Sequence, residues 1–343
     1  MQAWVVERPG PIGSGPLRRL DRPLPEPGPG ELRVRGSCCG VCRTDLHLAE
    51  GDLPPRRPSV TPGHEVVGTV EATGPGAARF AVGERVGVAW LGRTDGSCRY
   101  CRRGDENLCT GPAFTGWDTD GGYADACVVD ERYAYRLPEG LSDEQAAPLL
   151  CAGIIGYRAL RCAAVPPGGR LGIYGFGGSA HLTAQVAHAQ GMRVHVFTRG
   201  EHNRALAAEL GADSVGGAAD PAPEPLDGAI LFAPAGDLVP VALRALDRGA
   251  TLAVAGIWLS EIPALDYAAE LFEERRLRSV TANTRQDGEE FLRLAGRLGV
   301  RATTVAYPMA EAPAALADLA AGRFGGAAVL HNGPVSASAP PTA

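Results

Sequence analysis

From about Gly169 onward, short apolar segments alternate with Ala- and Leu-rich segments, and this alternation constrains the fold more than any other feature of the chain. The apolar segments predict buried strands, and the segments between them predict helices. The expected strands are Leu171–Tyr174, Val194–Phe197, Ala229–Phe232 and Thr251–Val254, with helices over Ser179–Gln190 and Asn203–Leu210. Strands and helices that alternate at this spacing indicate βαβ units and therefore a parallel sheet.

The regions on either side of this alternation have different patterns. The first 150 residues contain short apolar runs separated by Gly and Pro clusters, which is typical of a β-rich region. Strands are expected over Leu32–Arg35, Val66–Val70 and Arg85–Val88, and helices over Asp287–Leu298 and Glu311–Leu319. Because 343 residues exceed one ordinary core, two domains are expected. The low-complexity tail from Val335 is expected to be disordered.

Composition and charge limit the partners. The net charge of −6 at pH 7 gives no reason to expect a nucleic-acid or membrane-surface partner. No apolar run is long enough to span a bilayer, and Met1–Pro9 lacks the basic and apolar parts of a signal peptide, so a cytoplasmic protein is expected. The chain contains no lysine, which excludes a Schiff-base lysine and a P-loop lysine.

A glycine-rich turn follows the first expected strand of the alternating region. Gly175, Gly177, Gly178, Ser179 and Ala180 fit the pattern G-x-G-x-x-A between a strand and a helix. The first glycine permits a tight turn, the second lets the backbone approach a pyrophosphate, and the helix N-terminus presents free N–H groups to the phosphates. The pattern predicts a Rossmann dinucleotide site, and the alternative is a glycine-rich turn in another kind of α/β protein.

The end of the second expected strand bears on the choice of dinucleotide. An NAD enzyme usually places a carboxylate there to bind the ribose 2′-hydroxyl, but this chain has Thr198 and Arg199. A hydroxyl and a guanidinium suit a 2′-phosphate, so NADP(H) is favoured over NAD(H). The alternative is that Arg199 is a solvated loop charge.

Cys42, His64 and Cys151 are widely separated, and their spacing alone does not join them into a site. The segments that flank them indicate that they belong together. Gly40–His47 (GVCRTDLH), Pro62–Gly68 (PGHEVVG) and Leu149–Gly153 (LLCAG) resemble, in order, the three zinc-ligand segments of the zinc-containing medium-chain alcohol dehydrogenases. Tyr174–His181 and Thr284–Gly288 are most similar to the bacterial branch related to cinnamyl alcohol dehydrogenases.

This resemblance implies an α/β fold in which a Rossmann doubly wound parallel sheet, residues 152–284, is joined to a β-rich GroES-like catalytic domain, residues 1–151 and 285–343. It implies a catalytic Zn²⁺ on Cys42, His64 and Cys151, with one open position for the substrate oxygen. The reaction would be hydride transfer between NADP(H) or NAD(H) and a primary alcohol or aldehyde. A homodimer or homotetramer is expected.

The resemblance also assigns roles to neighbouring residues. Thr44 would begin and His47 would end a proton relay, Asp45 would orient His64, Glu65 would lie behind the metal, and Arg43 would reach the cofactor pyrophosphate. Trp90, Trp117 and Ile155 would line an apolar pocket suited to aromatic or medium-chain aliphatic substrates. Other interpretations stay open: Thr44 and Asp45 could cap local structure, His47 could be a surface residue, and the pocket residues could be core.

A second cluster contains Cys98, Cys101 and Cys109, with spacings x2 and x7. The family's structural zinc uses four cysteines, and Asp95 stands where the first would be. A Cys3Asp zinc site is expected, because a carboxylate can ligate zinc; the alternative is a weakened or empty site. Ala327 is a second departure, since many family members have an arginine near that place for the pyrophosphate.

Two other functions remain as alternatives. A zinc-free quinone or enoyl reductase of the same superfamily would not need Cys42, His64 and Cys151 together. A non-enzymatic zinc-binding module would not need the glycine-rich βαβ region, and a nucleic-acid partner would not suit the acidic balance.

Overall fold

The computed structural model describes residues 1–334 and divides into two compact units, which are described separately; the expectation for the tail lies outside this range. The first unit contains Met1–Cys151, Ala282–Gly296 and the chain from Ala302 onward. The second unit contains Ala152–Thr281 and Arg297–Arg301.

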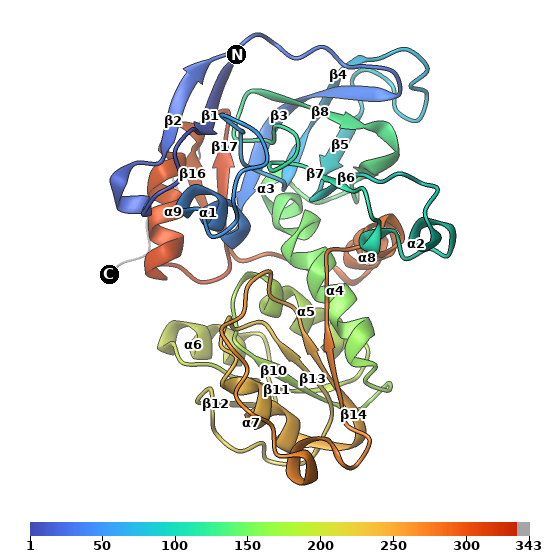
Figure 1. The fold of residues 1–343 in the computed structure, drawn as a ribbon, viewed down its shortest axis with the longest axis vertical. Coiled ribbons are helices and arrows are strands. Elements are labelled where there is room, and N and C mark those ends of the chain that lie inside the picture. Colours follow the sequence, from blue (N-terminus) through green and yellow to red (C-terminus); the bar gives the residue numbers. More distant parts are fainter. Residues whose placement is uncertain (335–343) are drawn as a thin grey trace. The chain divides into compact units, whose positions relative to one another are not determined.

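The second unit is built on a six-stranded parallel sheet with the order β12-β11-β10-β13-β14-β15 (Figure 1). Its strands are β10 (Arg170–Tyr174), β11 (Arg193–Phe197), β12 (Ser214–Gly216), β13 (Leu226–Leu231), β14 (Leu246–Val254) and β15 (Arg276–Ser279). Its helices are α4 (Ala152–Ala163), α5 (Gly178–Ala189), α6 (Glu201–Glu209) and α7 (Leu238–Ala245), followed by the π-helix η5 (Tyr267–Leu271). This strand order, which reverses next to β10, is that of a Rossmann sheet.

Helices cover both faces of this sheet. Alternate residues of a strand point to opposite faces. On β13, a Cβ at Gly228 would meet Ala163 at the end of α4, whereas Ala229 and Leu231 belong to the apolar cluster that includes α7. The sheet is therefore doubly wound, and the expected strands and helices of this region are confirmed to within a few residues.

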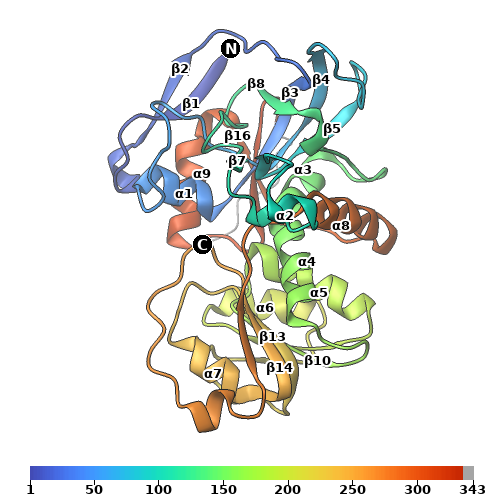
Figure 2. The same ribbon diagram turned by 45° about the vertical axis from the view of Figure 1, so that its right-hand side comes forward.

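The first unit is β-rich, and its main sheet has the order β16-β17-β3-β4-β5-β9, with β8 also paired to β3 (Figure 2). Its strands are β1 (Gln2–Val6), β2 (Leu17–Asp21), β3 (Glu31–Val41), β4 (Val66–Thr73), β5 (Arg85–Val88), β6 (Leu91–Arg93), β7 (Ala113–Phe114), β8 (Ala126–Asp130), β9 (Ala134–Arg136), β16 (Thr304–Pro308) and β17 (Ala327–His331). Its helices are α1 (Arg43–Glu50), α2 (Arg99–Arg102), α3 (Asp143–Ala146), α8 (Arg285–Leu298, mainly in this unit) and α9 (Ala312–Ala321).

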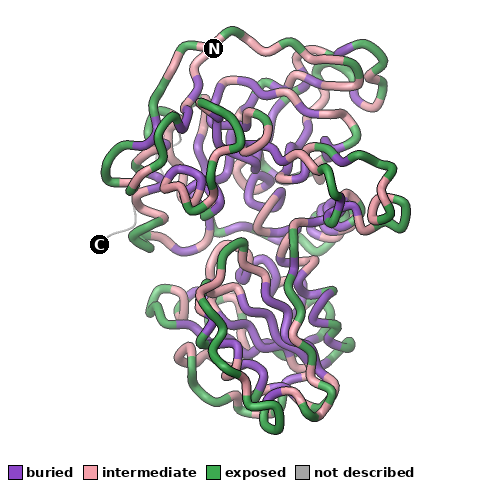
Figure 3. The backbone as a smooth tube through the Cα atoms, in the orientation of Figure 1, coloured by how far each residue is buried: buried purple, intermediate pink, exposed green. Residues whose placement is uncertain are grey.

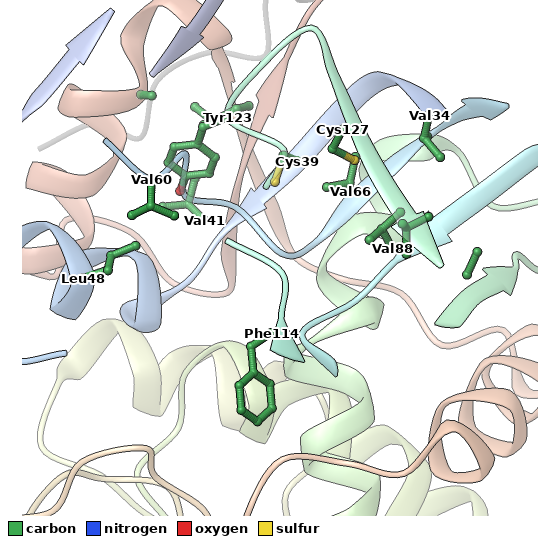
Figure 4. Packing of buried hydrophobic residues seen from close by; sticks show 14 of the residues in the cluster. Val34, Cys39, Val41, Leu48, Val60, Val66, Val88, Phe114, Tyr123 and Cys127 are labelled. Carbon is green, nitrogen blue, oxygen red and sulfur yellow. The ribbon is translucent and has the colours of Figure 1, made fainter. Parts of the chain in front are cut away.

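The long strand β3 organises the first unit. Its first half pairs with β8, its second half pairs with β17, and β4 runs along its other edge. Val34, Cys39 and Val41 of β3 are buried with Val66 of β4 and Tyr123 in one apolar cluster (Figure 4). The buried stretches of the backbone are coloured purple in Figure 3. Because β3 ends at Val41, this core fixes the position of the residue that follows it, Cys42.

Within residues 1–334, no single helix is long and apolar enough to cross a membrane. Two consecutive segments, Asp143–Leu150 and Ala152–Ala163, meet that test of length and composition only when taken together as a bent pair.

Candidate active site

Cys42 lies where β3 ends and α1 begins. It is the N-cap residue of α1, with an extended backbone, and its N–H donates a hydrogen bond of 2.9 Å to Asp45 Oδ2. Capping by an Asp three residues into the helix satisfies a backbone donor that the helix leaves free. The sequence therefore stops the strand and starts the helix at the residue whose thiol enters the site.

Asp45 also lies against His64. Its Oδ1 accepts a hydrogen bond of 3.0 Å from Gly63 N–H and lies 3.3 Å from His64 Nδ1. The Tyr123 hydroxyl donates to the other carboxylate oxygen at 3.4 Å. Asp45 and His64 are 2% and 1% exposed, so this arrangement is shielded from water. Nδ1 of His64 faces Asp45, and Nε2 faces the neighbouring thiols, which is the orientation of a metal-binding histidine.

Three sequence segments bring their donors to one point. His64 Nε2 lies 3.3 Å from Cys151 Sγ, and the two sulfur atoms of Cys42 and Cys151 are 3.9 Å apart. Ligand atoms of Cys42, His64, Glu65 and Cys151 all lie within 4.8 Å of one another, and we call these four residues the buried cluster. The structure thus brings together residues that sequence spacing could not join.

The side chain of Glu65, which belongs to the buried cluster, packs directly against the backbone of Gly40. A Cβ placed on Gly40 would lie 1.8 Å from Glu65 Oε2 and 2.9 Å from Glu65 Cβ, so any larger residue at position 40 would displace this side chain. Gly40 N–H also donates to Glu65 O at 3.0 Å. Gly40 and Tyr123 therefore support the cluster although the sequence analysis gave them no role; Gly40 has a signal in its place in the first motif segment, and Tyr123 lies in no motif segment.

Burial and mutual contacts shift the pKa values of the residues in the buried cluster. Hydrogen bonding with Cys151 lowers the pKa of Cys42 well below its ordinary value, against the effect of burial. Burial alone would lower the pKa of His64, but Asp45 raises it well above the usual range. Burial, reinforced by the charge on Cys42, raises the pKa of Glu65. Perturbations of this kind are concentrated at functional sites.

The donor set fits zinc. Two thiols, two carboxyl groups and one imidazole converge in the buried region, and the acids would carry excess negative charge if all were ionised. A divalent cation neutralises such charge. Thiolate and imidazole are donors that zinc favours, and three protein ligands with a further position for substrate are the arrangement of catalytic zinc sites.

Three stacked aromatic rings, Trp90, Phe114 and Trp117, extend from His64, and we call them the aromatic wall. The Trp90 ring meets the His64 ring edge-on at 4.9 Å between centroids, and it stacks on Phe114 at 4.9 Å and on Trp117 at 5.9 Å. Arg56 lies over the outer face of Trp117, with its guanidinium carbon 3.6 Å from the ring centroid. Trp90 thus lies beside the buried cluster, and Trp117 and Phe114 (Figure 4) stack on it further out.

The remaining residues expected near the metal lie on α1. Thr44 is buried, and its Oγ1 is 3.6 Å from Cys42 Sγ. His47 is one turn further along the helix and hydrogen-bonds Asp52. Arg43 is the first residue of α1 and is exposed. Ile155 lies on α4 in the second unit.

The glycine-rich turn has the geometry that its pattern predicts. Gly175 has φ +86°, and a Cβ there would lie 2.8 Å from the backbone N of Ala233, so only glycine fits without strain. Gly177 is the N-cap of α5, and a Cβ there would meet nothing within 4 Å. Gly178, Ser179 and Ala180 form the first turn of α5. The free N–H groups of this turn lie at the carboxyl end of β10, where parallel sheets bind nucleotides.

Thr198 and Arg199 lie beside that turn. Gly175 N–H donates to Phe197 O at 2.8 Å, which places the residues that follow β11 next to the glycine-rich turn. Thr198 is buried and its N–H donates to Gly216 O at 3.0 Å, whereas Arg199 is exposed. Arg204 of α6 donates to Thr198 O at 3.4 Å.

Asp95, Cys98, Cys101 and Cys109 form a second group, the surface cluster, whose ligand atoms also lie within 4.8 Å of one another. Asp95 Oδ1 accepts hydrogen bonds of 2.8 Å from the N–H groups of Ser97 and Cys98, which hold the pKa of this carboxyl well below its usual range. Its other oxygen lies 3.2 Å from Cys109 Sγ. One oxygen of Asp95 is therefore anchored to the backbone, and the other faces the thiols.

Comparisons with known proteins agree with this geometry. Residues 28–139 match the alcohol dehydrogenase GroES-like domain family, and residues 178–297 match the zinc-binding dehydrogenase family. The chain is 58% identical over 335 residues to the probable alcohol dehydrogenase AdhA of Mycobacterium tuberculosis, covering 96% of this chain and 97% of that protein. It is 35% identical over 340 residues to an alcohol dehydrogenase of Geobacillus stearothermophilus, covering 96% and 99%.

Solved structures agree as well. The structure matches the cinnamyl alcohol dehydrogenase SbCAD4 of Sorghum bicolor with a TM-score of 0.87 and 28% identity, covering 98% of this chain and 99% of that one. Fold and site together define an α/β enzyme with a GroES-like domain and a Rossmann-type domain. The chain belongs to the zinc-containing medium-chain alcohol dehydrogenases, so the predicted family, fold class and enzyme type are confirmed.

Proposed function

We propose that Cys42, His64 and Cys151 hold the catalytic zinc of this alcohol dehydrogenase. The observation that carries the proposal is the convergence of these three donors from separate segments, with Asp45 fixing the orientation of His64. When bound, zinc supplies a Lewis acid that lowers the pKa of an alcohol and polarises a carbonyl. A carboxylate oxygen of Glu65 lies within 4.8 Å of the donor atoms of these three residues and would contribute negative charge next to the metal.

The residues of α1 provide the proton path. Thr44 accepts the proton of the substrate hydroxyl from its place beside Cys42, and His47 passes it to solvent. A hydroxyl followed by an imidazole suits this task, because the first can both accept and donate while the second exchanges protons near neutral pH. Arg43, at the N-terminus of the same helix, binds the cofactor pyrophosphate.

The test is an assay of aldehyde reduction and alcohol oxidation across a panel of substrates, with NADH and NADPH in parallel, before and after chelation. Turnover should be lost on chelation and return when zinc is added. Turnover that persists at the parent rate in protein shown to contain no metal would contradict the proposal.

The second unit, within the expected dinucleotide-binding segment 152–284, binds NADP(H) in preference to NAD(H) under this proposal. The support is that the end of β11 carries a buried Thr198 and an exposed Arg199 beside the glycine-rich turn, and no carboxylate. Replacing Arg199 by Ala should weaken NADPH binding about tenfold or more and NADH binding little, because a guanidinium–phosphate pair is lost. Arg276→Ala, an exposed arginine on β15, is the control; equal losses for both cofactors would remove the argument.

The substrate is an aromatic or medium-chain aliphatic alcohol or aldehyde. The aromatic wall of Trp90, Phe114 and Trp117 supports this, since it offers apolar surface next to His64. We expect Ile155 to complete the apolar lining. Trp90→Ala should raise the KM for aromatic substrates more than the KM for ethanol; a uniform change across the panel would contradict this role.

The surface cluster holds a structural zinc with Cys3Asp ligation. The support is the anchoring of Asp95, which directs one carboxylate oxygen toward Cys109. The 1–151 and 285–343 segments then form the catalytic domain with both zinc sites. We also propose a homodimer or homotetramer, which light scattering of the purified protein would measure.

A further inference from the structure

The outer ring of the aromatic wall is held by a part of the chain to which the proposed function gives no role. Trp117 lies in the turn formed by residues 114–119, and its indole N–H donates a hydrogen bond of 2.9 Å to Pro54 O. Arg56, two residues after Pro54, places its guanidinium carbon 3.6 Å from the centroid of the Trp117 ring. The segment 54–56 therefore contacts both the edge and the face of this one indole.

Arg56 also pairs with the residue that follows Trp117. Its Nη1 lies 3.0 Å from Asp118 Oδ1 and 3.3 Å from Asp118 Oδ2. Asp118 is itself fixed, because its Oδ2 accepts a hydrogen bond of 2.9 Å from Phe114 N–H and its own N–H donates to Phe114 O at 2.9 Å. The side chain of Asp118 is 19% exposed and that of Arg56 is 46% exposed. A largely buried carboxylate in a fixed position thus sets where the guanidinium lies.

The inner and outer ends of the aromatic wall are supported differently. At the inner end, Trp90 lies between β5 and β6, contacts the His64 ring and accepts a backbone hydrogen bond of 2.9 Å from Thr115 N–H. At the outer end, Trp117 is half-buried and is joined to the segment 54–56, which belongs to neither a helix nor a strand. The position of Trp117 therefore depends on a loop, whereas that of Trp90 depends on the sheet.

An arginine suits the position of residue 56 better than another cation would. A planar guanidinium can stack flat on an indole and donate to a carboxylate at the same time, whereas an ammonium group is a point charge without a flat face. Contacts of both kinds are weak at exposed sites. Removing them should therefore change how firmly the Trp117 ring is held and leave the fold of the unit intact.

We propose that Arg56 is a positioning residue that sets the substrate preference of the enzyme. Fixed by Asp118, it holds Trp117 stacked on Trp90, so that the aromatic wall offers one continuous surface to an aromatic ring of the substrate. When Arg56 is removed, Trp117 is held less firmly, and an aromatic substrate loses packing surface that a two-carbon substrate does not use. The inference rests on the proposed role of the aromatic wall and extends it to a residue outside the ligand segments.

The first test observes Trp117 directly and does not depend on catalysis. The chain has four tryptophans, so protein labelled with 5-fluorotryptophan should give four ¹⁹F resonances, and that of Trp117 is the one missing in Trp117→Phe. In Arg56→Ala, the Trp117 resonance should shift or broaden, while that of Trp4 should stay in place. A Trp117 resonance that Arg56→Ala leaves unchanged would overturn the proposal.

The second test measures substrate preference. Arg56→Ala should raise the KM for benzaldehyde about three- to tenfold, and it should leave the KM for acetaldehyde and the kcat for both aldehydes within about twofold of the parent. Arg56→Lys, which keeps the charge beside Asp118 but not the flat stacking, should recover part of the loss. The double variant Arg56→Ala/Trp117→Ala should be no worse than Trp117→Ala, because Arg56 acts through Trp117. Equal changes for both aldehydes in Arg56→Ala would contradict a role in substrate preference.

Arg57→Ala is the matched control. Arg57 is the next residue and is also exposed, and its partner Asp120, at 3.6 Å, keeps a contact of 3.0 Å with Arg22. This variant should keep the parent KM values and the parent Trp117 resonance. The same changes in Arg57→Ala as in Arg56→Ala would overturn the proposal, since they would come from the loss of positive charge alone.

The failure of this inference can be told apart from the failure of the proposed function. If Trp117→Ala raises the KM for benzaldehyde and Arg56→Ala does not, the inference about Arg56 fails while the aromatic wall stands. If Trp117→Ala has no such effect, the aromatic wall and the inference fail together. An inactive parent enzyme would count against the proposed function itself, and the ¹⁹F spectra would still decide whether Arg56 positions Trp117.

Discussion

The buried cluster and the surface cluster each gather four metal-binding side chains within 4.8 Å, yet they are assembled in opposite ways. The ligands of the buried cluster come from the residue after β3, the loop before β4 and the residue before α4, so tertiary structure makes the site. Those of the surface cluster come from one segment, residues 95–109, and that segment's own backbone anchors Asp95.

The buried cluster and the surface cluster therefore depend on different parts of the fold. The supports of the buried cluster are Asp45, Tyr123 and Gly40, so a change in any of them should reach the chemistry. The surface cluster is linked to the rest of its unit through Glu106, whose carboxylate pairs with Arg285 of α8 at 2.7 Å. Loss of the surface cluster should destabilise the segment 95–109 without removing a catalytic group.

The largest effect is expected at the buried cluster. Cys151→Ala removes a zinc ligand, and alcohol oxidation should fall at least about a hundredfold, because the Lewis acid is lost or displaced. Cofactor binding, measured by titration of the purified variant, should change little. Cys127→Ala, which removes a buried thiol of β8, is the control; similar losses in both variants would assign the effect to packing.

Asp45→Asn tests the support behind the ligand. Asn keeps the shape but removes the charge that holds His64 Nδ1, so zinc affinity or activity should fall about 10- to 100-fold. Zinc retained after dialysis and kcat are the two readouts. Unchanged zinc affinity and unchanged kcat would show that Asp45 serves only as the cap of α1.

A pair of glycines compares packing at the two sites. Gly40→Ala would place a Cβ 1.8 Å from Glu65 Oε2 and should destabilise the protein by about 1–3 kcal/mol. In Gly111→Ala, the new Cβ would lie 3.9 Å from Asp95 Oδ2, an ordinary contact, and stability should change by less than about 0.5 kcal/mol. Denaturant unfolding measures both; equal costs would mean that the buried cluster is not the more tightly packed site.

The smallest effect on catalysis is expected at Asp95. Asp95→Ala should lower zinc content and shift Tm downward by a few degrees, while the kcat of the folded enzyme stays within about twofold of the parent. Asp95→Cys should restore zinc. A large loss of kcat in folded, surface-zinc-free protein would break the distinction between the two clusters.

Much of the fold could be predicted from the sequence, because its signals are local. The strands and helices from Arg170 to Val254 follow from apolar periodicity, and the turn at Gly175 follows from its glycines. The ends of elements shifted by a few residues; β13, for example, begins at Leu226 and ends at Leu231, because strand length is set by pairing with β10 and β14.

The two metal-binding clusters also differ in how far the sequence alone predicts them. The surface cluster is visible as a spacing, whereas the buried cluster required a family resemblance, since no spacing rule joins Cys42 to Cys151. The role of Tyr123 and the packing role of Gly40 were not identified. Their contributions depend on which backbone passes beside which side chain, and that information exists only after the chain has folded.

The most direct test of the central claim is to count zinc per chain and measure single-turnover alcohol oxidation in the parent, in Cys42→Ala and in Asp95→Ala. We expect two zinc ions in the parent and one in each variant, with oxidation abolished only in Cys42→Ala. Oxidation at the parent rate in Cys42→Ala would contradict the assignment of the buried cluster as the catalytic centre.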